Sequence, residues 1–333
     1  MVAETTIRTA AREFAFADDR RAWIELSSSL GLYLSGLFAA MFYFPNWWLM
    51  IPLTVVAGAM QLRIYMIQHD CLHFAFFSSR RLNRFWGKLL SVISMTPFEI
   101  TRAVHNLHHT HVSDLDRRDT FEIPVMTLDE WERASAWRRL HYRLYRSPIT
   151  LVFVGPFLFY GLVRRLPIYG ESNHYSDLAV HNLMLGGFLG TIWYLAGWPG
   201  VAIWAAAFYI SSLGAIIPYV VHNFEDIHWG VKPELDFETA ALEGSAVMDW
   251  GWFFDLVVMN IGYHDLHHLN AKIPGYKLKE AHNELERRGL IDPTKVGFLD
   301  GMRSLRWKLY DRENARMIPF PKPDKSLHAV PTN

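Results

Sequence analysis

The chain has 333 residues, of which 51% are hydrophobic and 15% aromatic, and its charged residues balance at a formal net charge of zero. Its single cysteine, Cys71, excludes an intramolecular disulfide framework and a thiolate metal site, and we expect no nucleic-acid partner. A chain of this length often forms two soluble domains, but its long uncharged stretches predict one all-α integral membrane domain over residues 1–333.

The uncharged stretches predict two hairpins of membrane-spanning helices, at residues 24–68 and 179–221. Residues 24–44 carry one acid at their edge, and after a Pro-Asn break residues 47–62 are also free of charge. Residues 183–221 contain no charged side chain. They are long enough for two helices of roughly 20 residues, with the sequence Gly-Trp-Pro-Gly as the turn.

Basic residues orient these helices. Four arginines precede the first hairpin: Arg8, Arg12, Arg20 and Arg21. Neither hairpin turn carries a charge, whereas residues 69–147 and 222–310 are rich in Lys and Arg. By the positive-inside rule, the N-terminal segment 1–23 and both polar blocks face the cytoplasm and form a helical cap. The proline-rich stretch 311–333 is predicted to be a loose tail.

Residues 147–163 are apolar but at the short limit for a membrane span. A pair of arginines flanks them on each side, so a full crossing would place one pair outside. We therefore predict a re-entrant segment, bent at Gly155-Pro156, and an interfacial stretch at 85–104. Four spans are the favoured count, and six would result if both segments crossed the membrane.

Histidines gather in three clusters, each at or just beyond a predicted cytoplasmic helix end. Residues three and four apart share one face of a helix, and the sequences HDCLH (69–73), HNLHH (105–109) and HDLHH (264–268) all have this spacing. One further histidine directly follows the second hairpin. The nine candidate metal ligands are His69, His73, His105, His108, His109, His222, His264, His267 and His268.

An isolated histidine at a membrane interface is commonly an amphipathic residue with its tip in water. That explanation does not account for three clusters, each on one helix face and each at a point where the chain reaches the cytoplasmic side of the membrane. Close imidazoles would also repel one another if they were protonated, unless a cation held them neutral. We therefore interpret the clusters as a metal site.

The number of imidazoles exceeds the need of one ion and suits two ions with four or five ligands each. Nitrogen ligands alone suit iron, copper, zinc and nickel about equally well. A two-metal site beside an apolar interior, without the HExxH pattern of zinc hydrolases, suggests O₂ activation on a lipid-like substrate and hence two iron ions. A histidine-rich metal transporter or binding protein is the alternative, but the nearly uncharged spans count against transport.

The three boxes, in this order, resemble those of the membrane fatty acid desaturase superfamily. The sequences DLDRRD (114–119), HNFED (222–226), ALEGS (241–245) and NIGYHDLHHLNAKIPGYKL (260–278) extend the resemblance to its acyl-lipid Δ12-type branch. The resemblance implies a di-iron centre with O₂ as co-substrate, His222 as an extra ligand, and double-bond insertion into a fatty-acyl chain carried by lipid, CoA or ACP. Hydroxylation, acetylene formation and decarboxylation to a terminal alkene share this architecture and stay open as alternatives.

Besides His228, the sequence departs from the family pattern at three positions. Asp265 stands where relatives often have a histidine. His111 stands where they usually have a small or polar residue, which makes it a candidate to contact a ligand or the substrate. Pro218 stands where stearoyl-type enzymes have an asparagine that steadies a metal-bound water, so Asn223 and Asn260 become the candidates for that role.

Carboxylates beside the boxes are candidates to accept the second imidazole N–H and so to orient the ligands. They are Asp70, Glu225, Asp226 and Asp265. The histidines off the clustered faces are predicted not to bind metal: His141, His174, His181, His282 and His328. His228 is unusual for the family and is as readily a surface residue.

No electron-transfer domain is discernible in the sequence, so electrons are expected from a separate carrier such as a ferredoxin or a b-type cytochrome. Several arginines are candidates to steer an acidic carrier, or else to bind lipid headgroups: Arg80, Arg81, Arg84, Arg138 and Arg139. Aromatic residues at 43–48, 74–86 and 250–254 are candidates to line a substrate tunnel, although an aromatic belt at the membrane interface explains many of them equally well.

Overall fold

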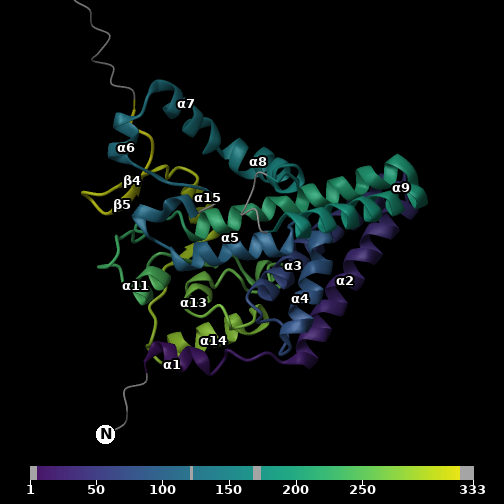
Figure 1. Ribbon diagram of the computed structural model, residues 1–333, viewed down its shortest axis with the longest axis horizontal. Coiled ribbons are helices and arrows are strands. Elements are labelled where there is room, and N and C mark those ends of the chain that lie inside the picture. The colour runs from purple at the N-terminus through teal and green to yellow at the C-terminus, as the bar shows by residue number, and fades with distance from the viewer. Residues whose placement is uncertain (1–5, 121–122, 168–173, 323–333) are drawn as a thin grey trace, which may run out of the picture.

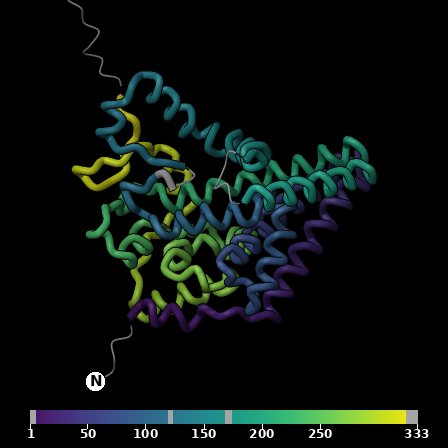
Figure 2. The backbone as a smooth tube through the Cα atoms, in the orientation of Figure 1, coloured from purple at the N-terminus to yellow at the C-terminus, as the bar shows by residue number. Residues whose placement is uncertain are grey.

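The computed structural model describes residues 6–120, 123–167 and 174–322. Within these residues the fold is mostly helical, which confirms the predicted fold class, and the strands are few and short. Long apolar helices form one end of the molecule and shorter helices form the other (Figure 1). The tube in Figure 2 shows how the C-terminal part of the chain returns to the N-terminus, where α14 (Gly275–Arg287) packs against α1 (Ile7–Arg12).

The first hairpin consists of α2 (Asp19–Phe42) and α3 (Trp47–Leu72). Asp18 is the N-cap of α2, and its side chain accepts a hydrogen bond from the backbone N–H of Arg21. Helix α3 continues beyond the predicted end of the span and is buried almost throughout its second half. Its last turn therefore carries His69 from the membrane-spanning part of the molecule into the core.

The second hairpin is the helix α9 (Tyr175–Ser212), which is interrupted at Gly197. The backbone there has φ 62° and ψ −158°, a conformation that favours glycine. A Cβ placed on Gly200 would lie 3.3 Å from Cγ2 of Ile192, so the two arms of α9 are in contact across the break (Figure 1). The break falls on the first residue of the predicted turn, and the second arm continues through η5 (Leu213–Ala215) into α10 (Ile216–Val221).

Among the described residues, three helical segments are long and apolar enough to cross a membrane: α2, α3 and the segment Tyr175–Val221, which contains the break at Gly197. Helix α7 (Ala136–Tyr145) and the following segment Ile149–Arg165 add a fourth if together they form one broken span. The two parts of this pair are bent by 52° relative to each other. A broken span and a re-entrant loop share this geometry.

The predicted bend within residues 147–163 lies elsewhere than expected. These residues form a π-helix η2 (Ile149–Val154), then α8 (Gly155–Gly161), and η3 (Val163–Arg165) follows. Pro156 follows Val154 and Gly155, whose backbones are both helical, so the chain continues from η2 into α8 without a break. The prediction of a bend at Gly155-Pro156 was therefore wrong, and the bend precedes Ile149.

The stretch 85–104, predicted as one interfacial element, belongs to two helices, α4 (Arg80–Ser94) and α5 (Phe98–Thr110). Helix α4 ends at Met95, whose backbone is left-handed with φ 61°. Pro97 precedes α5, and a proline disfavours a helical conformation in the residue before it. The break lets α5 turn back across α3 with the second histidine box.

The shorter helices form a cap over the ends of α3, α5 and α9. Helix α13 (His264–Leu269) carries the third histidine box and packs against α14 and α11 (Phe237–Leu242). The other helices of this part are η1 (Leu115–Thr120), α6 (Leu128–Arg133), α12 (Trp252–Val257) and α15 (Phe298–Ser304).

Two small sheets brace the cap. In the first, β1 (Met126–Thr127) pairs in parallel with β4 (Leu309–Asp311), and β5 (Arg316–Ile318) pairs antiparallel to β4. In the second, β2 (Val247–Asp249) pairs in parallel with β3 (Lys295–Gly297).

The prediction of a loose tail over 311–333 was wrong for its first part. Tyr310 of β4 pairs with Met317 of β5, and the side chain of Met317 is fully buried. Only four residues separate β4 from β5, and this short hairpin was not recognised in the proline-rich stretch. Residues 323–333 lie outside the described residues.

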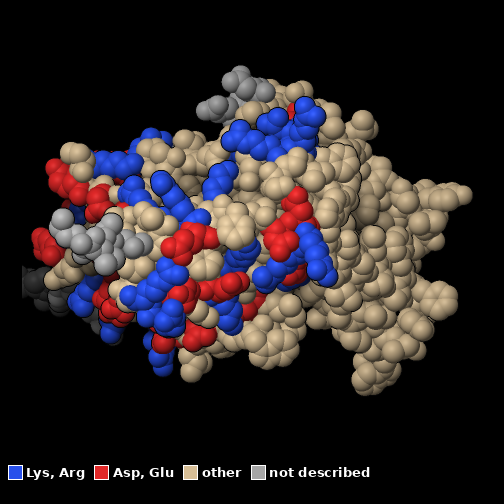
Figure 3. All heavy atoms as spheres, turned by 90° about the horizontal axis from the view of Figure 1, so that it is seen from below, with Lys and Arg blue, Asp and Glu red and all other residues tan. Residues whose placement is uncertain are grey.

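Charged side chains gather on one half of the face in Figure 3, and the other half is almost free of them. The uncharged half is the end formed by the long helices α2, α3 and α9. Large apolar side chains are exposed there, including Trp48, Tyr194 and Trp198. An exposed apolar surface of this extent is stable in contact with lipid rather than water.

Candidate metal centre

The nine candidate histidines meet in the interior of the molecule in two groups. Within each group, one ring nitrogen of every member lies within 4.8 Å of the others. The first group has five members: His69, His73, His105, His109 and His267. The second group has four members: His108, His222, His264 and His268. The structure therefore brings together all nine residues and divides them in a way that the sequence did not specify.

Helix geometry explains the division. His108 and His109 are adjacent on α5, so their side chains point in directions about 100° apart and enter different groups. The adjacent pair His267 and His268 on α13 is divided in the same way. Helices α5 and α13 therefore each contribute to both groups, whereas the end of α3 contributes only to the five-membered one.

The five-membered group has a common centre at its Nε2 atoms. The Nε2 atom of His105 lies 2.8 Å from that of His69, 3.0 Å from that of His73 and 3.0 Å from that of His109. A neutral imidazole has one N–H and one lone pair, so His105 cannot form hydrogen bonds to three other nitrogens through one atom. Two nitrogen ligands at right angles around an ion would be about 3 Å apart, so these contacts fit a bound cation.

The four-membered group has its ring orientation set by backbone carbonyls. His222 Nδ1 lies 2.9 Å from the carbonyl oxygen of Gly244, and His264 Nδ1 lies 3.3 Å from that of Ile261. If Nδ1 carries the proton, as these acceptors require, the Nε2 lone pair is directed into the group. The Nε2 atoms of His222 and His268 are 3.2 Å apart. This group too has the donor set of a metal site.

Burial keeps these imidazoles neutral. It lowers the pKa of His105, His109 and His268 well below the ordinary value, and neighbouring imidazoles add to the effect. Burial also lowers the pKa of His222 to about 4, against a smaller opposing contribution from its bond to Gly244. Neutral imidazole is the form that ligates a metal.

Two of the four candidate carboxylates are buried beside the boxes. Asp70 accepts a hydrogen bond of 2.7 Å from the backbone N–H of Gly275, and its other oxygen is 3.8 Å from His69 Nδ1. Asp265 accepts from the N–H of Leu266, and its second oxygen lies 3.2 Å from Nε2 of His282. Asp70 thus ties the first box to the loop after the third, and Asp265 contacts a histidine outside both groups.

Glu225 and Asp226 do not lie as expected. Both side chains are exposed, and among the described contacts none joins either carboxylate to an imidazole. The chain turns outward directly after Phe224, which is buried, so the acids that follow His222 in sequence point away from it. Their predicted role in orienting the ligands is not supported.

The candidates for holding a metal-bound water have other partners. Asn223 accepts from Arg146 Nη2 at 2.6 Å and donates to two backbone carbonyls. Asn260 donates to the carbonyl of Gly275 at 2.8 Å. His111 caps α5 and lies 3.2 Å from Arg117 Nη1, outside both groups. All three side chains tie segments of the cap together.

The other histidines that the structure describes also lie outside both groups. His141 is exposed, and His228 is partly exposed with Nδ1 3.9 Å from Glu243. His181 is buried against Ser91, and His174 precedes α9, whereas His328 lies outside the described residues.

His282, predicted not to bind metal, lies outside both groups, but the sequence did not predict its contact with Asp265. His282 is fully buried against Asp265. The signal that identifies it is the i, i+4 spacing from Leu278 to the buried His282 on α14, which places it on the inner face of that helix.

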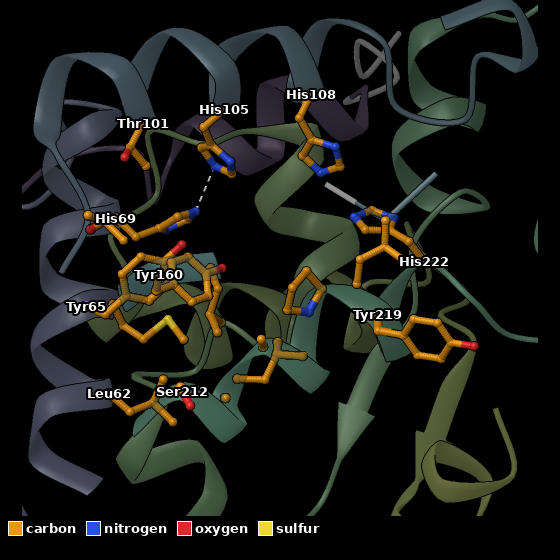
Figure 4. A pocket seen from close by; sticks show the side chains of 18 of the residues that line it. Leu62, Tyr65, His69, Thr101, His105, His108, Tyr160, Ser212, Tyr219 and His222 are labelled. Carbon is orange, nitrogen blue, oxygen red and sulfur yellow. Dashed lines mark hydrogen bonds between the residues drawn. The ribbon is translucent and has the colours of Figure 1, made fainter. Parts of the chain in front are cut away.

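Both histidine groups open on one apolar cavity of about 130 Å³. Figure 4 shows His69 and His105 from one group and His108 and His222 from the other around it. Apolar and aromatic side chains complete the wall, among them Leu62, Tyr65, Met66, Tyr160, Phe208 and Ile217. The cavity can hold an alkyl segment against the candidate metal centre, and we call it the acyl cavity.

The aromatic residues expected to line such a cavity do not do so. None of the residues at 43–48, 74–86 and 250–254 belongs to the described lining, and Trp48 and Phe85 are exposed. Tyr65 lines it instead, and this residue precedes His69 by four positions on α3, so helix periodicity was the signal for it.

Comparison with known proteins gives concordant results. The family model described as fatty acid desaturase matches residues 45–293, a range that contains all nine histidines. A fatty acid desaturase of Bacillus subtilis is 32% identical over 82% of this chain and 78% of its own length. An sn-1 oleoyl-lipid 12-desaturase of Synechocystis is 23% identical over 84% of this chain and 80% of its own length. An sn-1 acyl-lipid omega-3 desaturase (ferredoxin) of Synechocystis is 23% identical over 74% of this chain and 70% of its own length.

Proposed function

The chain belongs to the fatty acid desaturase family, and on that premise we propose that it inserts a double bond into a membrane acyl lipid with a di-iron centre held by the nine histidines. Family membership confirms the resemblance seen in the histidine boxes and makes the protein a membrane oxidoreductase. The observation that carries the proposal is the opening of both histidine groups on one apolar cavity.

The proposed ligands are the members of the two groups, with five imidazoles for one ion and four for the other. When bound, the iron pair would supply O₂ activation and the removal of hydrogen from two adjacent methylenes. Overall, one O₂, two electrons and two protons, together with the two hydrogens removed, yield one double bond and two waters.

The contribution of the chain itself is position. The side chains of Tyr65, Tyr160 and Phe208 hold an alkyl segment in the cavity, and the groups of imidazoles lie along one wall. Holding one pair of methylenes beside the metals selects these C–H bonds among many equivalent ones and orients them for reaction. An apolar wall also excludes bulk water from the reacting carbons.

A lipid-linked acyl chain and a separate electron carrier complete the proposal. The Synechocystis relatives are named for acyl-lipid substrates, and one of them is named for ferredoxin. A small carrier such as a ferredoxin or a b-type cytochrome is therefore the proposed electron source. We place residues 1–23, 69–147 and 222–310 on the cytoplasmic side within a single desaturase domain, from the distribution of basic residues.

Lipid profiling tests this proposal. The full chain is expressed in a host that lacks desaturases, and the total fatty acids are analysed by gas chromatography and mass spectrometry. We expect products that carry one more double bond and are lighter than their precursors by two hydrogens, and none with the matched variant His105→Ala. A hydroxylated, acetylenic or terminal-alkene product would replace desaturation with the corresponding related activity, and an unchanged profile with correctly inserted protein would contradict the proposal.

A further inference from the structure

A second, strongly basic pocket lies on the surface beside the five-membered histidine group. It has a volume of about 500 Å³ and is formed by the turn after α3, the start of α4 and the first turns of α5. We call it the Phe74 pocket. Its lining residues are Phe74, Arg80, Arg81, Arg84, Phe85, Lys88 and Arg102.

Four cations surround the ring of Phe74. The guanidinium carbons of Arg80, Arg84 and Arg102 lie 5.5, 5.9 and 4.9 Å from its centroid. The ammonium of Lys272 lies 5.7 Å from it. Such contacts each contribute about 0.5–1 kcal/mol at exposed sites, too little to account for gathering four like charges around one ring.

Two carboxylates nearby, Glu99 and Asp177, neutralise only part of this positive charge. Glu99 lies 3.4 Å from Arg84 and 3.9 Å from Arg102, and Asp177 binds Lys88 at 2.8 Å. Arg80 and Arg81 have exposed side chains and no carboxylate partner among the described contacts. The pocket therefore presents net positive charge to the solvent.

The pocket adjoins the candidate metal centre but not the acyl cavity. Phe74 directly follows His73, whose backbone carbonyl accepts a hydrogen bond from Lys272. Arg102 precedes His105 by one turn of α5. The described linings of the Phe74 pocket and of the acyl cavity have no residue in common.

We propose that the Phe74 pocket is the docking site of a small acidic protein that delivers electrons one at a time. This inference rests on the proposed function, which needs two electrons for each double bond. A carrier whose acidic face meets these cations comes within one residue of His73, and electron transfer is fastest over the shortest gap. Cations at the rim also steer an acidic partner and accelerate its association.

Charge reversal tests the docking site. The full chain in nanodiscs is assayed with increasing concentrations of a reduced acidic [2Fe–2S] ferredoxin, for the parent and for the double variant Arg80→Glu/Arg81→Glu. We expect the KM for ferredoxin to rise about tenfold or more at low salt, with kcat within about twofold, because the reversed charges repel an acidic carrier without altering the metal centre. A tenfold rise corresponds to about 1.4 kcal/mol of lost attraction. The matched control is the double variant Arg312→Glu/Arg316→Glu, two exposed arginines outside the pocket, which leaves the KM unchanged.

A second measurement separates docking from the chemistry. Protein reduced by dithionite is exposed to O₂ in a single turnover, which needs no carrier, and the double variant is expected to form as much product as the parent. A parent that forms no product in this assay contradicts the proposed function instead of the docking site.

Two results would overturn the docking assignment. One is an unchanged KM for ferredoxin in the double variant. The other is a variant whose thermal stabilisation by anionic lipid is lost while its ferredoxin KM stays at the parent value, because the pocket would then bind phosphate headgroups of the membrane.

Discussion

The imidazoles of His109 and His268 lie with their ring centroids 4.3 Å apart and their planes inclined by 33°, although each ring belongs to a different histidine group. His109 directs Nε2 toward His105, and His268 directs Nε2 toward His222. The wall between the two groups therefore consists of histidine side chains that belong to the groups themselves. We infer that the two proposed metal sites form and fail together.

Removing one imidazole of the first group should abolish product. His105→Ala takes away the nitrogen that contacts three others. This leaves an open coordination position and weakens the binding of the ion. Activity is measured by fatty-acid profiling and metal content by mass spectrometry. His141→Ala, at an exposed position on α7, is the control and should stay within a few-fold of the parent.

His222→Ala is the corresponding test of the second group and should also abolish product. If this variant keeps full activity and metal content, His222 is not a ligand. Activity in several variants of the box histidines would contradict the metal centre as a whole.

His282 gives a prediction about stability. Its ring is fully buried and lies 3.2 Å from the buried carboxylate of Asp265, so His282→Ala leaves that carboxylate without this partner. We expect a loss of about 1–3 kcal/mol in the free energy of unfolding, seen as a lower melting temperature, while the folded fraction keeps its metal content and stays active within a few-fold. An unchanged melting temperature would show that the contact contributes nothing.

The end of the acyl cavity gives a prediction about substrate length. A Cβ added at Gly214 would collide with the side chain of Leu62, and both residues line the cavity. Gly214→Ala should lower turnover on long acyl chains about 5- to 150-fold, the equivalent of an overpacking cost of about 1–3 kcal/mol. The double variant Leu62→Ala/Gly214→Ala should recover much of it, since the colliding side chain is gone.

The matched control for the cavity is Gly187→Ala, because no atom lies within 4 Å of a Cβ at Gly187. Turnover is measured on acyl chains of several lengths. Equal activity of the Gly214 and Gly187 variants would mean that the acyl chain does not reach this end of the cavity.

The proposed topology is open to cysteine labelling, since Cys71 is buried. Cysteines introduced at Asn46 and Trp198, in the exposed hairpin turns, should react with an impermeant reagent from outside the cell. Cysteines at Glu234 and Leu166 should react only after the membrane is opened. Labelling of Leu166 from outside would mean that residues 147–163 cross the membrane.

Helix periodicity carried most of what the sequence could predict about the site. The spacing of three and four residues places His105 and His109 on one face of α5, and the same rule identifies the inner face of α13. The division into groups of five and four depends on how α3, α5 and α13 cross. That crossing is set by packing between segments distant in sequence, which a local pattern does not contain.

Adjacency in sequence was a poor guide to the partners of the histidines. Glu225 follows His222 closely but faces solvent, whereas the carbonyl of Gly244, from another segment, contacts the ring of His222. Backbone carbonyls have no sequence signature, so this orienting contact could not be predicted. The strand at Met317 was missed for a similar reason, because its pairing with Tyr310 stabilises a stretch with no strong strand pattern of its own.

The metal content of the purified full chain tests the central claim most directly. Protein produced in iron-replete medium, with iron, zinc, copper and nickel quantified by mass spectrometry against the amount of chain, should contain two metal ions per chain, one for each histidine group. Two zinc ions would still support the two-ion site, because an overexpressed protein can acquire the wrong metal. A reproducible content of one ion or none would contradict the account.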